Sequence, residues 1–208
     1  MPVLDVCGVA RRFGRRLLFR DLSFSLSGGE CLAVTGVNGS GKSTLLRILA
    51  GVMSPSEGTV SLRVNGTGLS KEAHPLHAGL VAPYVNVYAG FSPRENLRFI
   101  ARARRLANDE QRIEETLASV GLARRMHDRV STFSSGMVQR VRLAAALLAD
   151  PPLLLLDEPN EHLDEEGRHM MSAVIEDRLR AGAIMVVATN DEREAKQYAR
   201  TLCVEEYR

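Results

Sequence analysis

Near the start of the chain stand Gly36-Val37-Asn38-Gly39-Ser40-Gly41-Lys42-Ser43-Thr44, whose spacing G-x-x-x-x-G-K-S is that of a loop that cradles phosphate. The glycines free the backbone to wrap a polyphosphate, with consecutive N–H groups pointing inward as donors. An apolar run from Cys31 to Val34 precedes the loop. A helix expected to begin near Lys42 directs its positive dipole end at the same anion. We expect Lys42 to reach the outer phosphates and the Ser43 hydroxyl to ligate Mg²⁺.

A second apolar run ends in two carboxylates. Leu153 to Leu156 is followed directly by Asp157 and Glu158. A strand that is apolar on both faces belongs in the middle of a parallel sheet, and ligands of such sheets bind at the carboxyl ends of the strands. We therefore expect Asp157 to hold Mg²⁺ through its water shell and Glu158 to orient or deprotonate the water that attacks the γ-phosphate. A strand that merely ended in solvated acids would not predict the phosphate loop far upstream.

The rest of the chain predicts an α/β fold with a mostly parallel sheet, because strand and helix patterns alternate. Apolar residues at every second position from Leu22 to Leu26 indicate an N-terminal antiparallel β ribbon. Amphipathic patterns predict a helical subdomain over 92–137, inserted within one domain that spans 1–208. The last expected units are a helix over Asp164–Leu179, a strand over Ala183–Thr189 and a final helix over Glu192–Arg200, with almost nothing after it.

Composition is that of an ordinary folded protein. The 208 residues are 45% apolar and 25% charged, and a net charge of +2 is too small to indicate a nucleic-acid partner. The arginine clusters at 11–16 and 102–105 are interpreted as solvated faces, since they lack the interleaved aromatic residues of single-strand binders. We expect no signal peptide, and Asp150-Pro151-Pro152 interrupts the most apolar region, which rules out a spanning helix there.

Cysteine and histidine give no metal pattern. Cys7, Cys31 and Cys203 lie far apart, and we expect buried thiols in a reducing cytosol. The five histidines show no ligand spacing joined to cysteines, so no zinc site is expected.

For two candidate contacts, the residues alone allow two interpretations each. Phe13 is either a platform for an adenine ring or a packing residue. The turn Ser134-Ser135-Gly136 ahead of a helix is either an anion-binding helix N-terminus or an ordinary N-cap.

Together, four segments resemble the ATP-binding cassette (ABC) ATPases, and the resemblance covers essentially the whole chain. In that family's order they are the Walker A loop at 36–43, the signature at 134–140, the Walker B strand at 153–159 and the D-loop at 161–164. The resemblance implies a P-loop NTPase that binds ATP and Mg²⁺ and hydrolyses ATP. It also implies a head-to-tail dimer, in which Ser134, Gly136 and Asp164 of one cassette complete the ATP site of the other.

Some positions depart from the family pattern. Pro83 stands where the family usually carries a glutamine that touches Mg²⁺ and water, and Asn190 stands where a histidine contacts the γ-phosphate. Ser135 and Met137 replace the usual glycine and glutamine of the signature. An amide donates a hydrogen bond but carries no charge. We therefore expect ATP binding to be intact and hydrolysis to be slow or differently coupled.

The resemblance implies the ATP-hydrolysing subunit of an ABC transporter, which dimerises on ATP to power a separate membrane permease. The expected partners are that permease and a second copy of this chain, with no nucleic acid, and the expected location is the cytoplasmic face of the cell membrane. The opening at 17–24 is similar to small exporter cassettes, including those of the haem exporter of cytochrome c biogenesis. Two alternatives are an ATP-sensing regulatory module and a non-transport ATPase that works on DNA or ribosomes, whose relatives are usually longer.

Overall fold

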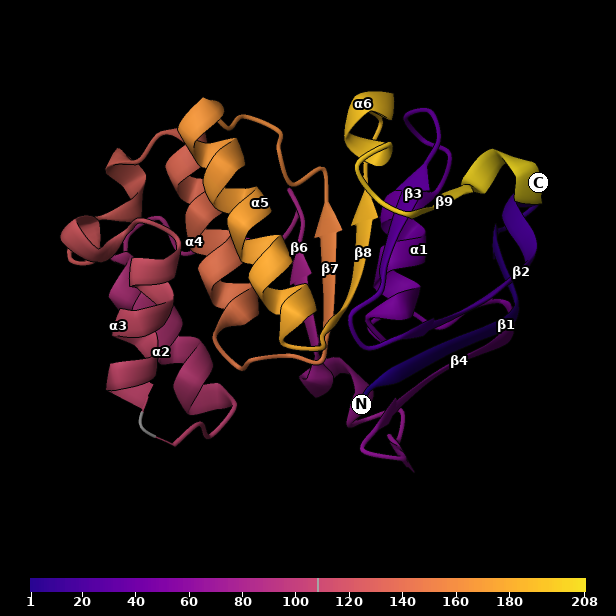
Figure 1. Ribbon diagram of the computed structural model, residues 1–208, viewed down its shortest axis with the longest axis horizontal. Coiled ribbons are helices and arrows are strands. Elements are labelled where there is room, and N and C mark those ends of the chain that lie inside the picture. Colours follow the sequence, from indigo (N-terminus) through magenta and orange to yellow (C-terminus); the bar gives the residue numbers. More distant parts are fainter. Residues whose placement is uncertain (108) are drawn as a thin grey trace.

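The computed structural model describes residues 1–107 and 109–208, which form two sheets with helices around them (Figure 1). The antiparallel sheet has the order β2-β1-β4-β5, with β1 at Val3–Phe13, β2 at Arg16–Ser27, β4 at Glu57–Val64 and β5 at Thr67–Gly68. The parallel sheet has the order β6-β7-β8-β3-β9, with β6 at Ala78–Val81, β7 at Leu153–Asp157, β8 at Ile184–Ala188, β3 at Cys31–Thr35 and β9 at Arg200–Cys203. The helices are α1 (Lys42–Leu49), α2 (Pro93–Ala103), α3 (Asp109–Ser119), α4 (Ser135–Leu147), α5 (Glu165–Arg180) and α6 (Glu192–Ala195).

The β7 strand is buried on both faces, as its sequence predicts. Leu153 and Leu155 pack into one apolar cluster with α1, whereas Leu154 and Leu156 pack into a second cluster with α4 and α5. Figure 1 shows the same arrangement, with α4 and α5 on one face of the parallel sheet and α1 on the other. Because the strands run in the same direction, their carboxyl ends meet at one edge, and this edge holds both the phosphate loop and Asp157.

The expected N-terminal ribbon is present as the antiparallel pair β1 and β2. β4 and β5 extend this sheet, which the sequence patterns alone did not indicate. Its tightest backbone contact is at Gly58, where an added Cβ would lie 2.3 Å from the carbonyl oxygen of Gly8. β1 and β4 therefore approach as closely as they do only because that position has no side chain.

The region predicted as a helical insertion contains α2, α3 and the start of α4. α2 begins with a capping box, in which Ser92 and Glu95 satisfy each other's backbone N–H groups. Glu110 on α3 forms ion pairs with Arg94 and Arg98 of α2, and these hydrogen bonds lower the pKa of Glu110 to about 2. Apolar side chains of these helices share a cluster with β7, β8 and α5. The bounds 92–137 as a separate subdomain remain a prediction.

The C-terminal expectation was wrong in part. The helix expected over Glu192–Arg200 ends at Ala195, and Arg200–Cys203 forms β9, which pairs in parallel with β3 at the edge of the sheet. A short strand of mixed character that is completed by a distant partner leaves little local signal, and here sheet pairing overrides helical spacing.

The expected burial of all three thiols was also wrong. Cys7 on β1 is exposed, and Cys31 and Cys203 are half-buried. The side chains of β1 alternate between the core and solvent, and Cys7 follows the buried Val6 onto the open face. Among the described residues, none of the helices combines the length and apolar character that a membrane span requires.

Candidate functional site

The phosphate loop takes backbone conformations that glycine permits. Gly36, Gly39 and Gly41 have φ values of 140°, 80° and 116°, in the region that L side chains rarely adopt. The loop leads directly into α1, which begins at Lys42. Lys42 is 6% exposed, and its Nζ donates a hydrogen bond to the Gly36 carbonyl at 2.8 Å. Its ammonium group is thus held across the mouth of the loop, beside backbone N–H groups suited to an anion.

Asp157 lies at the carboxyl end of β7, where it is 2% exposed. Burial raises the pKa of this carboxyl, while a hydrogen bond from the Ser43 side chain and the positive charge of Lys42 oppose that rise. The fold thus brings together Ser43 and Asp157, the two oxygen donors expected for Mg²⁺. Mg²⁺ binds through one or two carboxylates together with substrate phosphates, so this sparse donor set fits that ion.

Glu158 follows Asp157 in a left-handed backbone conformation, with φ of 50°. The backbone N–H of Glu158 donates to the Ala188 carbonyl at 2.8 Å, which fixes this uncommon turn. One carboxylate oxygen, Oε1, lies 3.6 Å from Lys42 Nζ, and the other accepts the backbone N–H of Asn190 at 3.3 Å. Burial raises the pKa of Glu158, and the Asn190 hydrogen bond and Lys42 oppose it. A carboxylate in this position is suited to accept a proton.

A cavity of about 620 Å³ opens over the phosphate loop. Its lining includes Phe13, Arg16, Leu18, Asn38, Lys42, Ser43, Pro83, Tyr84, Asp157 and Glu158. Phe13, at the end of β1, is 48% exposed, and the guanidinium of Arg11 lies 4.5 Å from its ring centroid. Phe13 therefore presents an open aromatic face at the cavity rather than a core contact.

The position expected to hold a glutamine presents different chemistry. Pro83 lines the cavity but has no side-chain donor or acceptor. The next residue, Tyr84, also lines the cavity, and the guanidinium of Arg47 lies 3.8 Å from its ring centroid. Sequence reasoning missed Tyr84, which stands out only once its contact with Arg47 of α1 is seen.

Asn190 follows β8 and reaches the loop from the opposite side. Its Nδ2 donates to Asn38 Oδ1 at 3.4 Å, besides the backbone bond to Glu158. Asn190 therefore contacts both the loop and the proposed base, in the place where a γ-phosphate sensor is expected.

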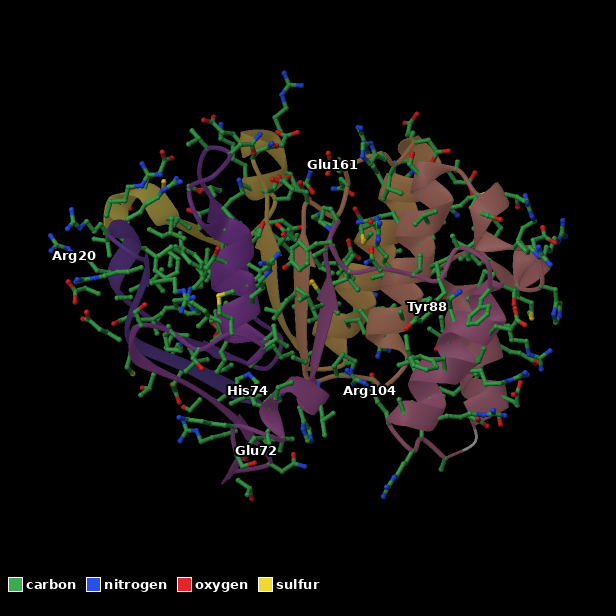
Figure 2. The ribbon with its side chains drawn as sticks, turned by 180° about the vertical axis from the view of Figure 1, so that it is seen from behind. Arg20, Glu72, His74, Tyr88, Arg104 and Glu161 are labelled. Atoms are coloured by element: carbon green, nitrogen blue, oxygen red, sulfur yellow. The ribbon has the colours of Figure 1, made fainter. Side chains whose placement is uncertain are left out.

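The signature residues lie away from this cavity. Ser134 is the N-cap of α4 and accepts the backbone N–H of Met137 at 3.3 Å, so the capping role is present. An added Cβ at Gly136 would lie 3.0 Å from the His162 carbonyl, so α4 starts against the D-loop. Asp164 caps α5 through the Gly167 N–H at 2.8 Å. In Figure 2, the D-loop residue Glu161 lies at the end of the molecule where the carboxyl ends of β7 and β8 also lie. Within one chain, Ser134, Gly136 and Asp164 are absent from the described lining of the cavity.

Other polar contacts at this edge gave no sequence signal. Glu205, after β9, accepts the backbone N–H of Val37 in the phosphate loop at 3.2 Å. Glu194 on α6 is buried and accepts hydrogen bonds from Thr189 and Asn160. Glu194 lies within the segment that was expected to be one continuous helix over Glu192–Arg200, and Glu205 lies after its expected end.

Comparisons with known proteins identify relatives of this chain. A sequence profile described as "ABC transporter" matches residues 19–161. The chain is 35% identical over 206 residues to the Nod factor export ATP-binding protein I of Rhizobium leguminosarum bv. viciae, which covers 97% of this chain and 65% of that protein. It is 33% identical over 208 residues to the protein of the same name from Rhizobium sp. (strain N33), covering 98% of this chain and 68% of that one. A solved structure of an ATP-binding subunit of an ABC transporter matches with a TM-score of 0.85 at 28% identity, over 97% of this chain and 85% of that one. The chain thus spans about 65% of the length of the first of these relatives.

Proposed function

Since the chain belongs to the ABC transporter family, we propose that it binds and hydrolyses ATP and that it powers a separate membrane permease. The family and the α/β P-loop fold were both expected from the sequence, and both expectations are confirmed. The single observation that carries the proposal is the convergence of Lys42, Asp157 and Glu158 beside one phosphate loop. The narrower likeness to haem exporters gains no support from these relatives.

ATP binding follows from the loop and its surroundings. Backbone N–H groups of the loop and the Lys42 ammonium face the cavity and would meet the phosphates, and the N-terminus of α1 adds its dipole. The open ring of Phe13 is placed to stack on the adenine. Lys42 now lies beside the Glu158 carboxylate, so an incoming triphosphate gives this buried ammonium a second anionic partner.

Ser43 and Asp157 would hold Mg²⁺ between them and the phosphates. When bound, Mg²⁺ supplies positive charge that offsets the charge developing on the phosphate oxygens. Burial raises the pKa of Asp157, and the Ser43 hydrogen bond and the Lys42 charge oppose that rise. A bound cation would favour the carboxylate further.

For hydrolysis, Glu158 accepts or orients the proton of the attacking water. Its Oε2 is fixed by the Asn190 N–H, so the carboxylate points along one edge of the cavity instead of turning into solvent. Asn190 then supplies a neutral donor toward the γ-phosphate, and Pro83 supplies none. Slow turnover is the expected consequence.

A second copy of this chain completes the site in the proposal. The N-terminus of α4, with Ser134 and Gly136, is absent from the described lining of the cavity over the chain's own phosphate loop, which fits a head-to-tail dimer in which it meets the nucleotide of the other copy. Sedimentation of Glu158→Gln tests this: ATP should convert monomer to dimer, and Gly136→Asp, which adds a carboxylate at that N-terminus, should abolish the shift. A monomer at every ATP concentration would contradict the second copy.

The proposed permease partner is supported by the relatives, which carry the name of export proteins, and by an exposed aromatic cluster. Tyr88, Phe91 and Phe99 are 55%, 46% and 55% exposed, and ring centroids lie 5.6 Å apart in both pairs that Tyr88 forms. Figure 2 labels Tyr88. Exposed apolar patches of this kind mark interaction surfaces. The proposed location is the inner face of the cell membrane, where such a permease presents its cytoplasmic loops.

Co-purification from detergent-solubilised membranes tests the partner. The proposal predicts capture of a polytopic membrane protein by the parent chain and its loss from a Phe91→Ser, Phe99→Ser double variant. Capture of ribosomes or nucleic acid would favour a non-transport ATPase. A stoichiometric soluble partner would favour a sensing module that clamps without turnover, the alternative that Pro83 and Asn190 keep open.

A further inference from the structure

Glu194 is a buried carboxylate behind the proposed base, and its role is not covered by the proposed function. It lies on the short helix α6 and is 7% exposed. Its Oε2 accepts the Thr189 hydroxyl at 2.7 Å, and its Oε1 accepts Asn160 Nδ2 at 2.8 Å. Thr189 in turn accepts the backbone N–H of Asp191 at 3.0 Å, so its hydroxyl hydrogen is directed to Glu194.

These two contacts join the two segments that carry the proposed chemistry. Asn160 stands two residues after Glu158, and Thr189 stands directly before Asn190. The same segments also meet through the Asn190 N–H, which donates to Glu158 Oε2. Glu194 therefore links the two segments at a second point: it accepts a hydrogen bond from Asn160, which follows Glu158, and one from Thr189, which precedes Asn190.

Packing alone does not account for an acid at this position. Ala195 already anchors α6 in the core, and Glu192 of the same helix is exposed. Burial raises the pKa of Glu194, whereas its hydrogen bonds from Thr189 and Asn160 lower it. An apolar side chain would fill the same space without the free-energy cost of burying a carboxyl group. What an apolar side chain cannot supply is two acceptors with a fixed separation.

The Asn160 amide depends on this acid for its orientation. Asn160 Oδ1 is buried and has no hydrogen-bond partner among the described residues, so the bond from Nδ2 to Glu194 is what fixes the side chain. Asn160 directly precedes the D-loop, which runs on to the N-cap of α5 at Asp164. A shift of Asn160 would therefore move the turn that presents Glu158.

We propose that Glu194 is a positioning residue, which holds the segment of Glu158 and the segment of Asn190 in register across the carboxyl edge of β7 and β8. It is absent from the described lining of the cavity over the phosphate loop and acts through Asn160 and Thr189. The effect on kcat rests on the proposed function, ATP hydrolysis. The effect on the positions of the two segments does not depend on hydrolysis.

Kinetics of four variants test the proposal: Glu194→Ala, Glu194→Gln, Asn160→Ala and the Asn160→Ala, Glu194→Ala double variant, with Glu192→Ala as the matched control on the same helix. Misplacement of the base should lower kcat of Glu194→Ala by roughly 10- to 100-fold. KM for ATP should stay within about twofold, because the phosphate loop is untouched. Glu194→Gln should recover most of kcat, since Asn160 can turn its unpartnered Oδ1 toward the new amide. The double variant should lose no more than the worse single variant.

Amide hydrogen exchange gives a second readout that needs no turnover. In Glu194→Ala and Asn160→Ala, exchange should quicken at 158–163 and 188–191 and stay unchanged at 36–44. If the parent chain binds ATP without hydrolysing it, the proposed function fails and the exchange result alone decides for or against Glu194. If Glu194→Ala does not fold, Asn160→Ala and Glu194→Gln carry the comparison. Three results would each overturn the proposal. The first is that Glu194→Ala has the kinetics and exchange of Glu192→Ala, and the second is that the losses of kcat add in the double variant. The third is that KM for ATP in Glu194→Ala rises by as large a factor as kcat falls.

Discussion

Replacing Asn190 with histidine should raise the turnover number for ATP. Asn190 bridges the proposed base and the phosphate loop, with its backbone N–H 3.3 Å from Glu158 Oε2 and its Nδ2 3.4 Å from Asn38 Oδ1. Its side chain is exposed and lines a neighbouring pocket together with Asn38 and Glu158, so a larger ring can be accommodated. The change replaces a neutral donor with one that carries positive charge when protonated.

The size of the gain follows from the difference between the two donors. A neutral hydrogen bond contributes about 1 kcal/mol net, and one from a charged group contributes about 2 kcal/mol. If the additional 1 kcal/mol or so acts on the γ-phosphate only in the transition state, kcat rises about fivefold. Because histidine in water titrates near pH ~6.5, the gain should be larger at about pH 6 than at about pH 8.5.

Phosphate release at saturating Mg²⁺ and ATP measures the effect. Asn190→Ala serves as the paired variant, since it removes the donor and should slow turnover below that of the parent. Equal turnover in the parent and in Asn190→His at both pH values would refute the reasoning that a weak γ-phosphate contact at Asn190 limits the rate.

The remaining predictions concern the pH profile, the close approach of β1 to β4 and the altered glutamine position. Burial raises the pKa of Glu158 above its ordinary 4.5, and a protonated carboxyl accepts no proton. As the pH is lowered, kcat/KM should therefore fall, with the midpoint of the fall above pH 4.5. A midpoint below pH 4.5 would contradict the assignment. Gly58→Ala and Gly66→Ala both place alanine at φ of 80°, which should lower the free energy of unfolding by about 1–2 kcal/mol. Only at Gly58 would the new Cβ meet the Gly8 carbonyl, and this contact should lower it by about 1–3 kcal/mol more. Equal free energies of unfolding in urea for these two variants would show that the close approach does not matter. Pro83→Gln should raise kcat by restoring a side-chain acceptor and donor at the cavity, and unchanged kinetics would show that this position does not limit turnover.

The parts of the molecule that local pattern determines were predictable from the sequence. The loop at 36–44 fixes its conformation through its own glycines, and the apolar run ending at Asp157 can be buried on both faces only inside a parallel sheet. The helix from Lys42, the helix expected over Asp164–Leu179 and the strand expected over Ala183–Thr189 are also present, as α1, α5 and β8.

The parts that depend on distant partners were not predictable. β9 becomes a strand because β3 leaves an open edge, and its four residues carry no pattern of their own. Glu194 and Glu205 look like surface acids in the sequence, since nothing there shows that Asn160 or the Val37 N–H will meet them. The composite nature of the proposed ATP site depends on a second chain and came from the family resemblance alone.

Steady-state phosphate release by the purified chain and by Glu158→Gln tests the central proposal most directly, with Glu176→Gln, an exposed glutamate of α5, as the matched control. The proposal predicts ATP hydrolysis by the parent and the control, and a loss of about 10²- to 10⁴-fold in Glu158→Gln with ATP binding retained. Equal hydrolysis by Glu158→Gln and the parent would contradict Glu158 as the base.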